Sequence, residues 1–262
     1  MAKDPQGEYG FHVRSYECGP DGTATFPALC NYLQEAASLH AKSLGFSKSD
    51  FEAAGRNITW VLARMRVCVA RYPDWDEEML VVTRPKLARK LAAYRDFEMT
   101  DASGGLVLRA ASEWMVIDTA ARRAVPVPQE IFASFEITVP PVLGSEAPFT
   151  PRLKFPADAP AAPAKEYTAM RSHIDLNGHV NNVRYMEWML ESAPDSAAMK
   201  PRDIEFAFRG ETFAGETVTS RSAPSPDGRG LFYSVSSAGG VECLAARDSS
   251  WSPSQGGESF QG

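Results

Sequence analysis

The sequence lacks several features that would assign a protein to a class at once. Among its 262 residues, no run approaches the roughly 18 to 20 apolar residues that a membrane-spanning helix needs. The first ten residues lack the apolar core of a secretory signal. The four cysteines are scattered, which predicts reduced thiols and neither a zinc site nor a disulfide framework. The net charge of −6 argues against nucleic acid as a main partner.

What the sequence does contain is the composition of an ordinary folded protein. Hydrophobic residues make up 44% and charged residues 23%, close to the averages for globular domains. The length allows one large domain or two of ordinary size, with enough apolar material for one or two cores. These values predict a globular, cytoplasmic protein and leave its function open.

One segment is unusually rich in proline. Seven of the 19 prolines fall between Pro140 and Glu166. Because proline lacks an amide donor and disfavours helix in the preceding residue, we expect an extended linker over 140–166. The linker separates a domain over 8–139 from a second domain over 167–252. The small and polar stretch 253–262 is predicted to be a flexible tail.

Each of the two parts shows one helical stripe followed by a run of strands. Apolar residues recur at helical spacing from Leu29 to Leu44, with Thr25 as the N-cap candidate, and from Val183 to Ala193, with Asn181 as its counterpart. Patterns typical of strands follow at 58–69, 79–84, 91–100 and 106–118, and again at 204–209, 216–222, 231–237 and 241–248. The sequence therefore predicts the same order of elements twice.

Weak internal similarity supports a duplication. Sliding the chain by 156 residues places Asp21 on Asn177 and Thr25 on Asn181. Separately, residues 71–78 resemble 209–216 at an offset of 138. A sheet wrapped around one long helix, present twice, is the simplest architecture that fits these patterns.

The densest cluster of polar residues lies at 171–185, just before the second predicted helix. Asp175, Asn177 and His179 alternate, so in an extended segment their side chains share one side. The helix that starts near Asn181 directs backbone amides to the same place, where they favour the negative charge of a carbonyl under attack. Histidine titrates near neutral pH and can activate a water molecule there.

Two other interpretations of this cluster stay open on spacing alone. Asp, Asn and Gly before a helix are also what an ordinary capping turn contains. A metal site formed by His173, Asp175 and His179 is the second alternative, but this spacing matches no strong ligand pattern and offers no fourth ligand. The residues alone do not decide between catalysis and capping.

The surrounding sequence supplies a resemblance. The run IDLNGHVNNVRYMEWMLESAP, which starts at Ile174, resembles the signature of acyl-acyl-carrier-protein thioesterases, which release fatty acids from carrier protein. The segments YGFHVRSYECGPDG, ITWVLARMRVCVARYPDWDEEM and RAASEWMVID resemble the first half of that family, so roughly residues 8–250 are covered. The resemblance implies an α+β fold, a tandem double hotdog in which each antiparallel sheet wraps around a long central helix. It also implies that the first domain binds the acyl chain, with Trp60 and Met65 as guesses for its lining.

The resemblance also implies the catalytic residues. Asp175, Asn177 and His179 match the Asp, Asn and His of the family, and Glu211 matches the acid of its Arg-Arg-Glu-Cys segment. The debated cysteine of that segment is Thr212 here, so we expect attack by water, with Glu211 and His179 handling its proton. Backbone N–H groups around Val180 are expected to polarise the thioester carbonyl.

The two copies differ at these positions. The first has Asp21 and Thr23 where the second has Asn177 and His179, and the offset of 138 places Pro73 opposite Glu211. A duplicated fold that keeps one active site would show this asymmetry.

The resemblance names acyl-carrier protein as the partner, and that protein is acidic. A basic docking surface is therefore expected where five basic residues gather around two strands: Arg84, Lys86, Arg89, Lys90 and Arg95. The first four are the docking candidates. The alternative is an ordinary solvated hairpin.

Neither a cofactor nor a metal is expected, and further dimerisation stays open. Because plant members carry a transit peptide and this chain starts close to the domain, the resemblance favours a bacterial cytoplasmic enzyme. Two other functions share the fold: an acyl-CoA thioesterase and a non-catalytic acyl-binding protein.

Overall fold

The computed structural model describes residues 6–132, 140–145, 148–157, 162–194 and 199–251, and it divides into two compact units. The first comprises Met1–Ala24 and Ala28–Phe149, and the second comprises Thr25–Pro27 and Thr150–Gly262. The division falls inside the proline-rich segment 140–166. The predicted tail at 253–262 lies outside the described residues.

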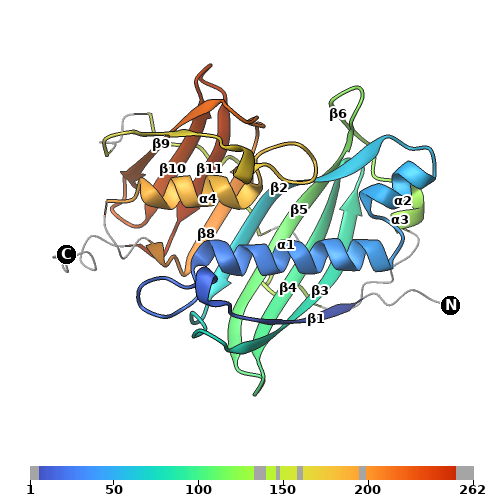
Figure 1. Cartoon of the computed structure of the whole chain (residues 1–262), viewed down its shortest axis with the longest axis horizontal. Coiled ribbons are helices and arrows are strands. Elements are labelled where there is room, and N and C mark those ends of the chain that lie inside the picture. Colours follow the sequence, from blue (N-terminus) through green and yellow to red (C-terminus); the bar gives the residue numbers. More distant parts are fainter. Residues whose placement is uncertain (1–5, 133–139, 146–147, 158–161, 195–198, 252–262) are drawn as a thin grey trace. The chain divides into compact units, whose positions relative to one another are not determined.

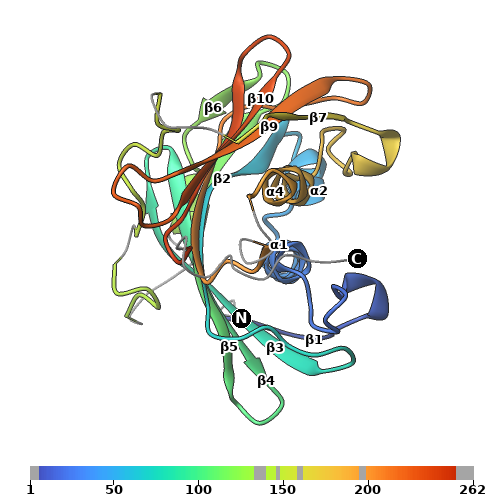
Figure 2. The same ribbon diagram turned by 90° about the vertical axis from the view of Figure 1, so that its left-hand side faces the viewer.

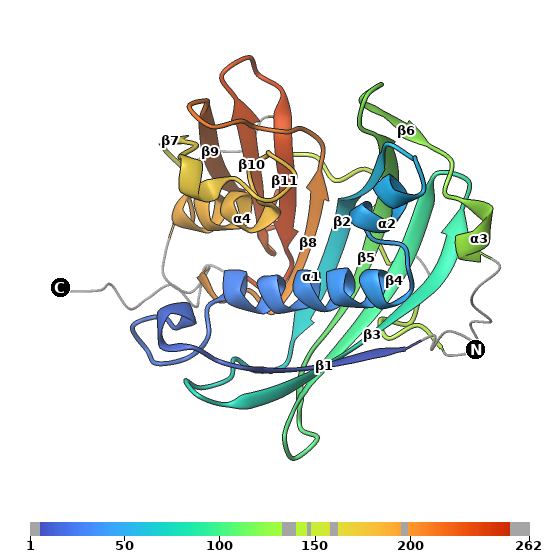
Figure 3. The ribbon, with the colours of Figure 1, turned by 45° about the vertical axis from the view of Figure 1, so that its right-hand side comes forward.

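The first unit is an antiparallel sheet curved around a helix (Figures 1 and 3). The strands follow the order β1-β3-β4-β5-β2, and β6 pairs with β5. Their bounds are β1 Gly7–His12, β2 Ile58–Val69, β3 Glu78–Arg89, β4 Ala92–Asp101, β5 Leu106–Asp118 and β6 Arg123–Val125. The long helix α1 (Phe26–Ser43) crosses one face, and the short helices α2 (Lys48–Ala53) and α3 (Gln129–Phe132) follow in the same unit.

The second unit repeats this plan on a smaller scale, and Figure 2 shows its sheet curving around helix α4 (Asn182–Glu191). The strand order is β7-β9-β10-β11-β8, which matches the first unit strand for strand. The bounds are β7 Lys165–Thr168, β8 Asp203–Phe208, β9 Thr217–Pro224, β10 Leu231–Ser237 and β11 Glu242–Asp248. The α+β double hotdog expected from the sequence is confirmed.

The sequence patterns explain why the helices start and end where they do. The side chain of Asn181 accepts a hydrogen bond from the Val183 amide at 2.9 Å, so it caps α4 as predicted. Gly45 has a φ of +73° just after α1, a conformation that favours glycine at a helix end. None of the described helices is long and apolar enough to cross a membrane.

Each repeat begins with a strand that the sequence patterns did not reveal. β1 has the sequence GEYGFH and β7 has KEYT, both too short or too rich in glycine to show an alternating pattern. The loops that follow are equivalent at the predicted offset of 156, because the isolated bridges Cys18–Ala24 and Ile174–Val180 differ by that number.

The second predicted offset was wrong by one residue. The Ala24 amide donates to the Pro73 carbonyl at 2.8 Å, and the Val180 amide donates to the Thr212 carbonyl at 3.0 Å. These equivalent bonds place Pro73 opposite Thr212 and Tyr72 opposite Glu211, an offset of 139. The offset of 138 came from matching identical residues in 71–78 and 209–216. The backbone hydrogen bonds show that the equivalent positions lie one residue further along. The first copy still has no acid at this position.

The described residues of the proline-rich segment make side-chain contacts with each of the two units. Phe149 stacks on Tyr94 of the first unit, with ring centroids 6.4 Å apart. In the second unit, the Thr150 amide and hydroxyl donate to the Glu205 carboxylate, and Leu153 is buried. Its described residues before β7 contain no helix, as the prolines predict.

Candidate active site

A tight loop at 175–179 carries three of the four predicted catalytic residues. Its base is closed by two hydrogen bonds, from the Asp175 amide to the His179 carbonyl and from the Asn181 amide to the His173 carbonyl, both 2.9 Å. Gly178 makes the turn with a φ of +83°, a conformation that L side chains rarely adopt. The loop therefore holds its side chains on a defined backbone directly before α4.

The Asp175 carboxylate makes a hydrogen bond within its own loop. Its Oδ1 accepts a hydrogen bond from the Asn177 amide at 2.8 Å, which is a turn closed by an aspartate side chain. This contact is local, so Asp175 orders the backbone that presents Asn177.

The Asn177 side chain has a buried oxygen with no hydrogen-bond partner in the described part of the chain. A buried amide oxygen left without a donor costs about 1–3 kcal/mol. Such a group is therefore rare unless a donor arrives from a ligand or from water. The same side chain also carries two N–H donors.

His179 and Glu211 approach each other across two different loops. The Nδ1 atom of His179 lies 3.6 Å from Oε1 of Glu211, and both side chains keep part of their surface exposed (29% and 39%). The rings of His179 and Phe213 form a T-shaped pair, with centroids 5.1 Å apart. Phe213 was not among the predicted residues, and its one sequence signal is its place two residues after Glu211.

The turn that carries Glu211 is fixed by its own hydrogen bonds. The Phe213 amide donates to the Glu216 carboxylate at 2.8 Å, and the Glu216 amide donates to the Phe213 carbonyl at 3.1 Å. The Val180 amide ties the catalytic loop to the same turn through Thr212.

The hydrogen bond of the Val180 amide contradicts the role that was predicted for it. The Val180 N–H was expected to face the thioester carbonyl, but it donates to the Thr212 carbonyl at 3.0 Å. Other amides at the start of α4 are also engaged, because Asn181 donates to His173 and Val183 donates to the Asn181 side chain. The Val180 N–H is therefore used to join the two loops and is not available to a thioester carbonyl.

Thr212 stands where the resemblance places a cysteine, and it is fully buried. A different cysteine lies next to it, since the Sγ atom of Cys243 is 3.6 Å from Oγ1 of Thr212. Burial raises the pKa of the Cys243 thiol. The thiol is therefore protonated at neutral pH and is a poor nucleophile.

His173, the third residue of the alternative metal set, is engaged elsewhere. Its Nδ1 accepts a hydrogen bond from the Met170 amide at 3.1 Å, and its ring meets the edge of Trp188. These contacts make it part of the turn before the loop.

An apolar cavity of about 100 Å³ lies in the first unit. It is lined by Ala37 and Ala41 of α1, by Leu44 and Phe46, and by Trp60 and Trp114 of the sheet. Of the two guessed lining residues, Trp60 lines this cavity, whereas Met65 is buried in the core and does not line it.

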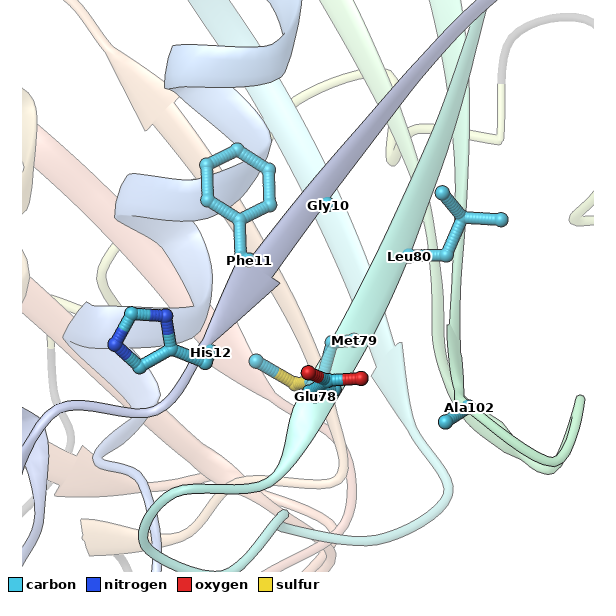
Figure 4. A pocket seen from close by; sticks show the side chains of 7 residues that line it. All are labelled: Gly10, Phe11, His12, Glu78, Met79, Leu80 and Ala102. Carbon is cyan, nitrogen blue, oxygen red and sulfur yellow. The ribbon is translucent and has the colours of Figure 1, made fainter.

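A larger and more open hollow of about 400 Å³ lies on the same unit beside β1 and β3 (Figure 4). Its lining residues are Gly10, Phe11, His12, Glu78, Met79, Leu80 and Ala102. None of the predicted catalytic groups is among them, so size does not identify the site here.

One of the four residues predicted to form a basic docking surface is not at the surface. Lys86 is buried, and its Nζ lies 3.2 Å from the Asp96 carboxylate, so it cannot contact a partner. The Asp96 carboxylate also accepts a hydrogen bond from the Val142 amide at 3.0 Å, so the proline-rich segment packs on this part of the sheet, which the sequence did not reveal. Arg89, the last residue of β3, and Lys90 in the turn after it are exposed, and Arg84 donates to Gln6 at 2.6 Å.

Comparison with known proteins gives a consistent answer. A model of the acyl-ACP thioesterase N-terminal domain matches residues 7–135, and one of the C-terminal domain matches residues 158–251. The palmitoyl-acyl carrier protein thioesterase of Cuphea hookeriana is 33% identical over 232 residues, which cover 84% of this chain and 55% of that protein. The corresponding Arabidopsis thaliana protein is 32% identical over 244 residues, which cover 89% and 58%.

Solved structures agree with these relatives. The 12:0-ACP thioesterase from Umbellularia californica superposes with a TM-score of 0.79 at 27% identity, covering 92% of each chain. An acyl-ACP thioesterase from Bacteroides thetaiotaomicron gives a TM-score of 0.81 at 23% identity, covering 94% of this chain and 98% of that one. The chain spans about half the length of the curated relatives it matches, 55% and 46% for two of them. The chain belongs to the acyl-ACP thioesterase family.

Proposed function

We propose that this protein hydrolyses the thioester of fatty acyl-acyl-carrier protein, releasing the free fatty acid and the carrier thiol. The observation that carries the proposal is the pairing of His179 with Glu211, 3.6 Å apart. The loop that carries His179 also carries the partnerless oxygen of Asn177. The relatives named above act on acyl-carrier protein thioesters by their names. The first unit has no histidine or acid at the positions of His179 and Glu211, so we assign catalysis to the second unit.

The proposed reaction is a direct attack by water. Glu211, with His179 beside it, accepts a proton as the water oxygen bonds to the thioester carbonyl carbon. The Asn177 oxygen accepts the second O–H of the water and orients it, and Asp175 holds the Asn177 backbone. When the tetrahedral intermediate collapses, the carbon–sulfur bond breaks and the sulfur takes up the proton. Because the Val180 amide is engaged, the developing oxyanion needs a donor other than that amide.

The first prediction concerns the two residues that handle the proton. Glu211→Gln and His179→Ala should each lower kcat for acyl-carrier protein by about 100-fold or more, since general-base catalysis typically contributes that much. Release of free acid, measured across chain lengths, is the assay. Glu166→Gln removes an exposed carboxylate from β7 and is the matched control. Near wild-type kcat in both site variants would refute the assignment.

The same assay separates the alternatives. An acyl-CoA thioesterase would show the higher kcat/KM on acyl-CoA of equal chain length, and a non-catalytic binding protein would release no acid from either. The cytoplasmic location and a homodimer stay predictions, as do the domain bounds 8–139 and 167–252.

A further inference from the structure

Helix α4 buries a phenol oxygen that makes no hydrogen bond. Tyr185 lies one turn after the cap residue Asn181, and its hydroxyl has no hydrogen-bond partner in the described part of the chain. Its ring forms a T-shaped pair with Trp188, with centroids 5.4 Å apart, which fixes the direction of the phenol. A buried hydroxyl without a partner is costly, so such a group is rare in a protein interior.

The residue beside this oxygen is Thr212, which follows Glu211 in the chain. Burial raises the pKa of the Tyr185 phenol, and the Thr212 hydroxyl and amide act against that rise, so both donors lie close to the oxygen. Thr212 is itself fully buried, and among the described residues its amide donates to no carbonyl. Its Oγ1 makes a weak contact with Sγ of Cys243 at 3.6 Å. Polar groups therefore lie side by side in the interior without a closed hydrogen bond to the phenol.

The first unit shows which residues fill these positions when no chemistry is assigned to them. The offset of 156 also relates the first residues of α1 and α4, so it places Leu29 opposite Tyr185. The backbone bonds compared above place Pro73 opposite Thr212.

A third pair of positions follows from equivalent backbone hydrogen bonds. In the first unit, the amides of residues 70–71 both donate to the Val107 carbonyl, at 2.9 and 3.3 Å. In the second unit, the amides of residues 209–210 both donate to the Cys243 carbonyl, at 2.8 and 3.4 Å. Val107 therefore lies opposite Cys243. The three residues of the first unit are all apolar and buried: Leu29, Pro73 and Val107.

This comparison separates packing from a second requirement. Apolar side chains fill the three positions in a unit with the same strand order, so packing alone does not call for a phenol beside a threonine. The polar set occurs in the unit that also holds the pair of His179 and Glu211. A buried hydroxyl that packing does not require is expected to serve the site.

The pair of His179 and Glu211 is not at hydrogen-bond distance in this structure. Its 3.6 Å exceeds the range of about 2.7–3.2 Å for an N–H···O hydrogen bond. Catalytic hydrogen bonds are often long before the substrate binds, and they tighten in its complex. Because Glu211 and Thr212 are consecutive, a bond that fixes Thr212 also fixes the backbone that carries the Glu211 carboxylate.

We propose that Tyr185 is a positioning residue of this site, which acts on Glu211 through Thr212. The Thr212 hydroxyl donates to the Tyr185 oxygen as the turn takes its catalytic position, and this bond holds the Glu211 carboxylate beside His179. Tyr185 itself touches no reacting atom. The inference rests on the proposed function, because it assumes that Glu211 handles the proton of the attacking water.

The experiment removes the two hydroxyls separately and together. Tyr185→Phe deletes one oxygen, and kcat for acyl-carrier protein should fall about 10-fold with KM unchanged, because a displaced base slows the chemistry and not the binding. The melting temperature should not fall, since the oxygen is unpaired in this structure. Thr212→Val keeps the shape without the hydroxyl and should lower kcat equally. The double variant should be no slower than either single one, because both remove the same bond.

Two further variants are the controls. Thr212→Ser keeps the hydroxyl and should retain most of the wild-type kcat. Tyr233→Phe removes another buried phenol oxygen from the same unit and should leave kcat unchanged. Tyr233 lies on β10, four residues before Ser237 at the end of that strand, where the pairing with Val218 follows the turn of Glu211.

The outcomes separate this inference from the proposed function. If the wild-type chain hydrolyses acyl-carrier protein and Tyr185→Phe turns over as fast, the inference is wrong while the proposed hydrolysis stands. Losses that multiply in the double variant, or an equal loss in Tyr233→Phe, would also overturn it. If the wild-type chain releases no acid, the proposed function is wrong and the role of Tyr185 falls with it. Should Tyr185→Phe fail to fold, the comparison of Thr212→Val with Thr212→Ser decides, because equal kcat values would refute the role of the hydroxyl.

Discussion

At the scale of single residues, one position limits the nucleophiles that the candidate site can use. Thr212 occupies the position of the family's debated cysteine, so a nucleophilic thiolate there is excluded by the sequence itself. The structure adds that Cys243 lies 3.6 Å from Thr212 and is fully buried. From its position alone, the Cys243 thiol could be taken for the nucleophile that Thr212 cannot supply. Its raised pKa argues the reverse, because the thiol and not the thiolate is present at neutral pH.

We therefore expect Cys243→Ala to keep turnover within about threefold of wild type, whereas unfolding becomes easier by about 1–2 kcal/mol because buried atoms are lost. Steady-state kinetics and urea unfolding measure the two effects separately. Treatment of the wild-type protein with iodoacetamide should leave activity intact at neutral pH. Rapid inactivation that the Cys243→Ala variant escapes would show that the thiol takes part after all.

At the scale of elements, the sequence predicted every long strand and both long helices, because their periodic patterns span many residues. It missed β1 and β7, whose short segments show no pattern, and it misplaced Pro73 by one residue against the second repeat. For the site, the motif gave Asp175, Asn177, His179 and Glu211. The engaged Val180 amide and the Phe213 contact depend on how two loops pair, and local sequence does not encode that pairing.

The turn between β4 and β5 is held together by the side chain of one aspartate. Asp101 accepts hydrogen bonds from the Ser103 amide and hydroxyl and from the Gly105 amide, at 2.6 to 2.9 Å, and it pairs with Arg71 at 2.6 Å. A Cβ atom at Gly105 would lie 2.5 Å from the Asp101 carboxylate, which explains the glycine. The bonds from Ser103, followed by those from Arg71 and Gly105, hold the pKa of Asp101 well below its usual range.

This shift predicts a pH dependence of stability. A carboxyl with a lowered folded-state pKa stabilises the fold above its unfolded pKa of about 3.9, and this contribution is lost as the pH falls through the folded value. Asp101→Asn should therefore lower the free energy of unfolding at pH 7, and its deficit relative to wild type should shrink below about pH 4. Urea unfolding across that range measures the difference. An equal deficit at acidic and neutral pH would mean that packing of the turn, and not its charge, is responsible.

At the scale of the whole molecule, the two units share one strand order but differ in the side chains at equivalent loop positions. The loop of the first unit keeps the turn, with Gly22 at a φ of +80° and the Thr23 amide donating to Asp21, yet Tyr72 stands where the second unit has Glu211. The first unit therefore keeps the hydrogen bonds that shape the loop but has none of the proposed catalytic groups at the equivalent positions. The apolar cavity lined by Trp60 and Trp114 lies in this first unit, where the resemblance led us to expect the acyl chain.

The net charge of −6 bears on the proposed function, because it would repel the acidic carrier protein that the proposal requires. The exposed residues that remain from the predicted basic surface are Arg89 and Lys90, after the loss of Lys86 to the interior. If they guide the carrier, the double variant Arg89→Glu with Lys90→Glu should raise KM for acyl-carrier protein about 10-fold and leave kcat and the KM of a small acyl thioester unchanged. The increase should shrink at high salt, since screening weakens contacts between exposed charges.

A matched control separates a local contact from the change in total charge. Arg122→Glu with Arg123→Glu makes the same change of charge at the exposed turn between β5 and β6 of the same unit. A contact surface at Arg89 and Lys90 predicts a rise in KM for the first pair alone. If both pairs raise KM equally, long-range repulsion between two acidic proteins explains the effect and the turn after β3 is no docking site. If both substrates are affected alike by the first pair, the substitutions disturb the acyl unit itself, because Arg89 also lies 5.8 Å from the ring of Tyr94.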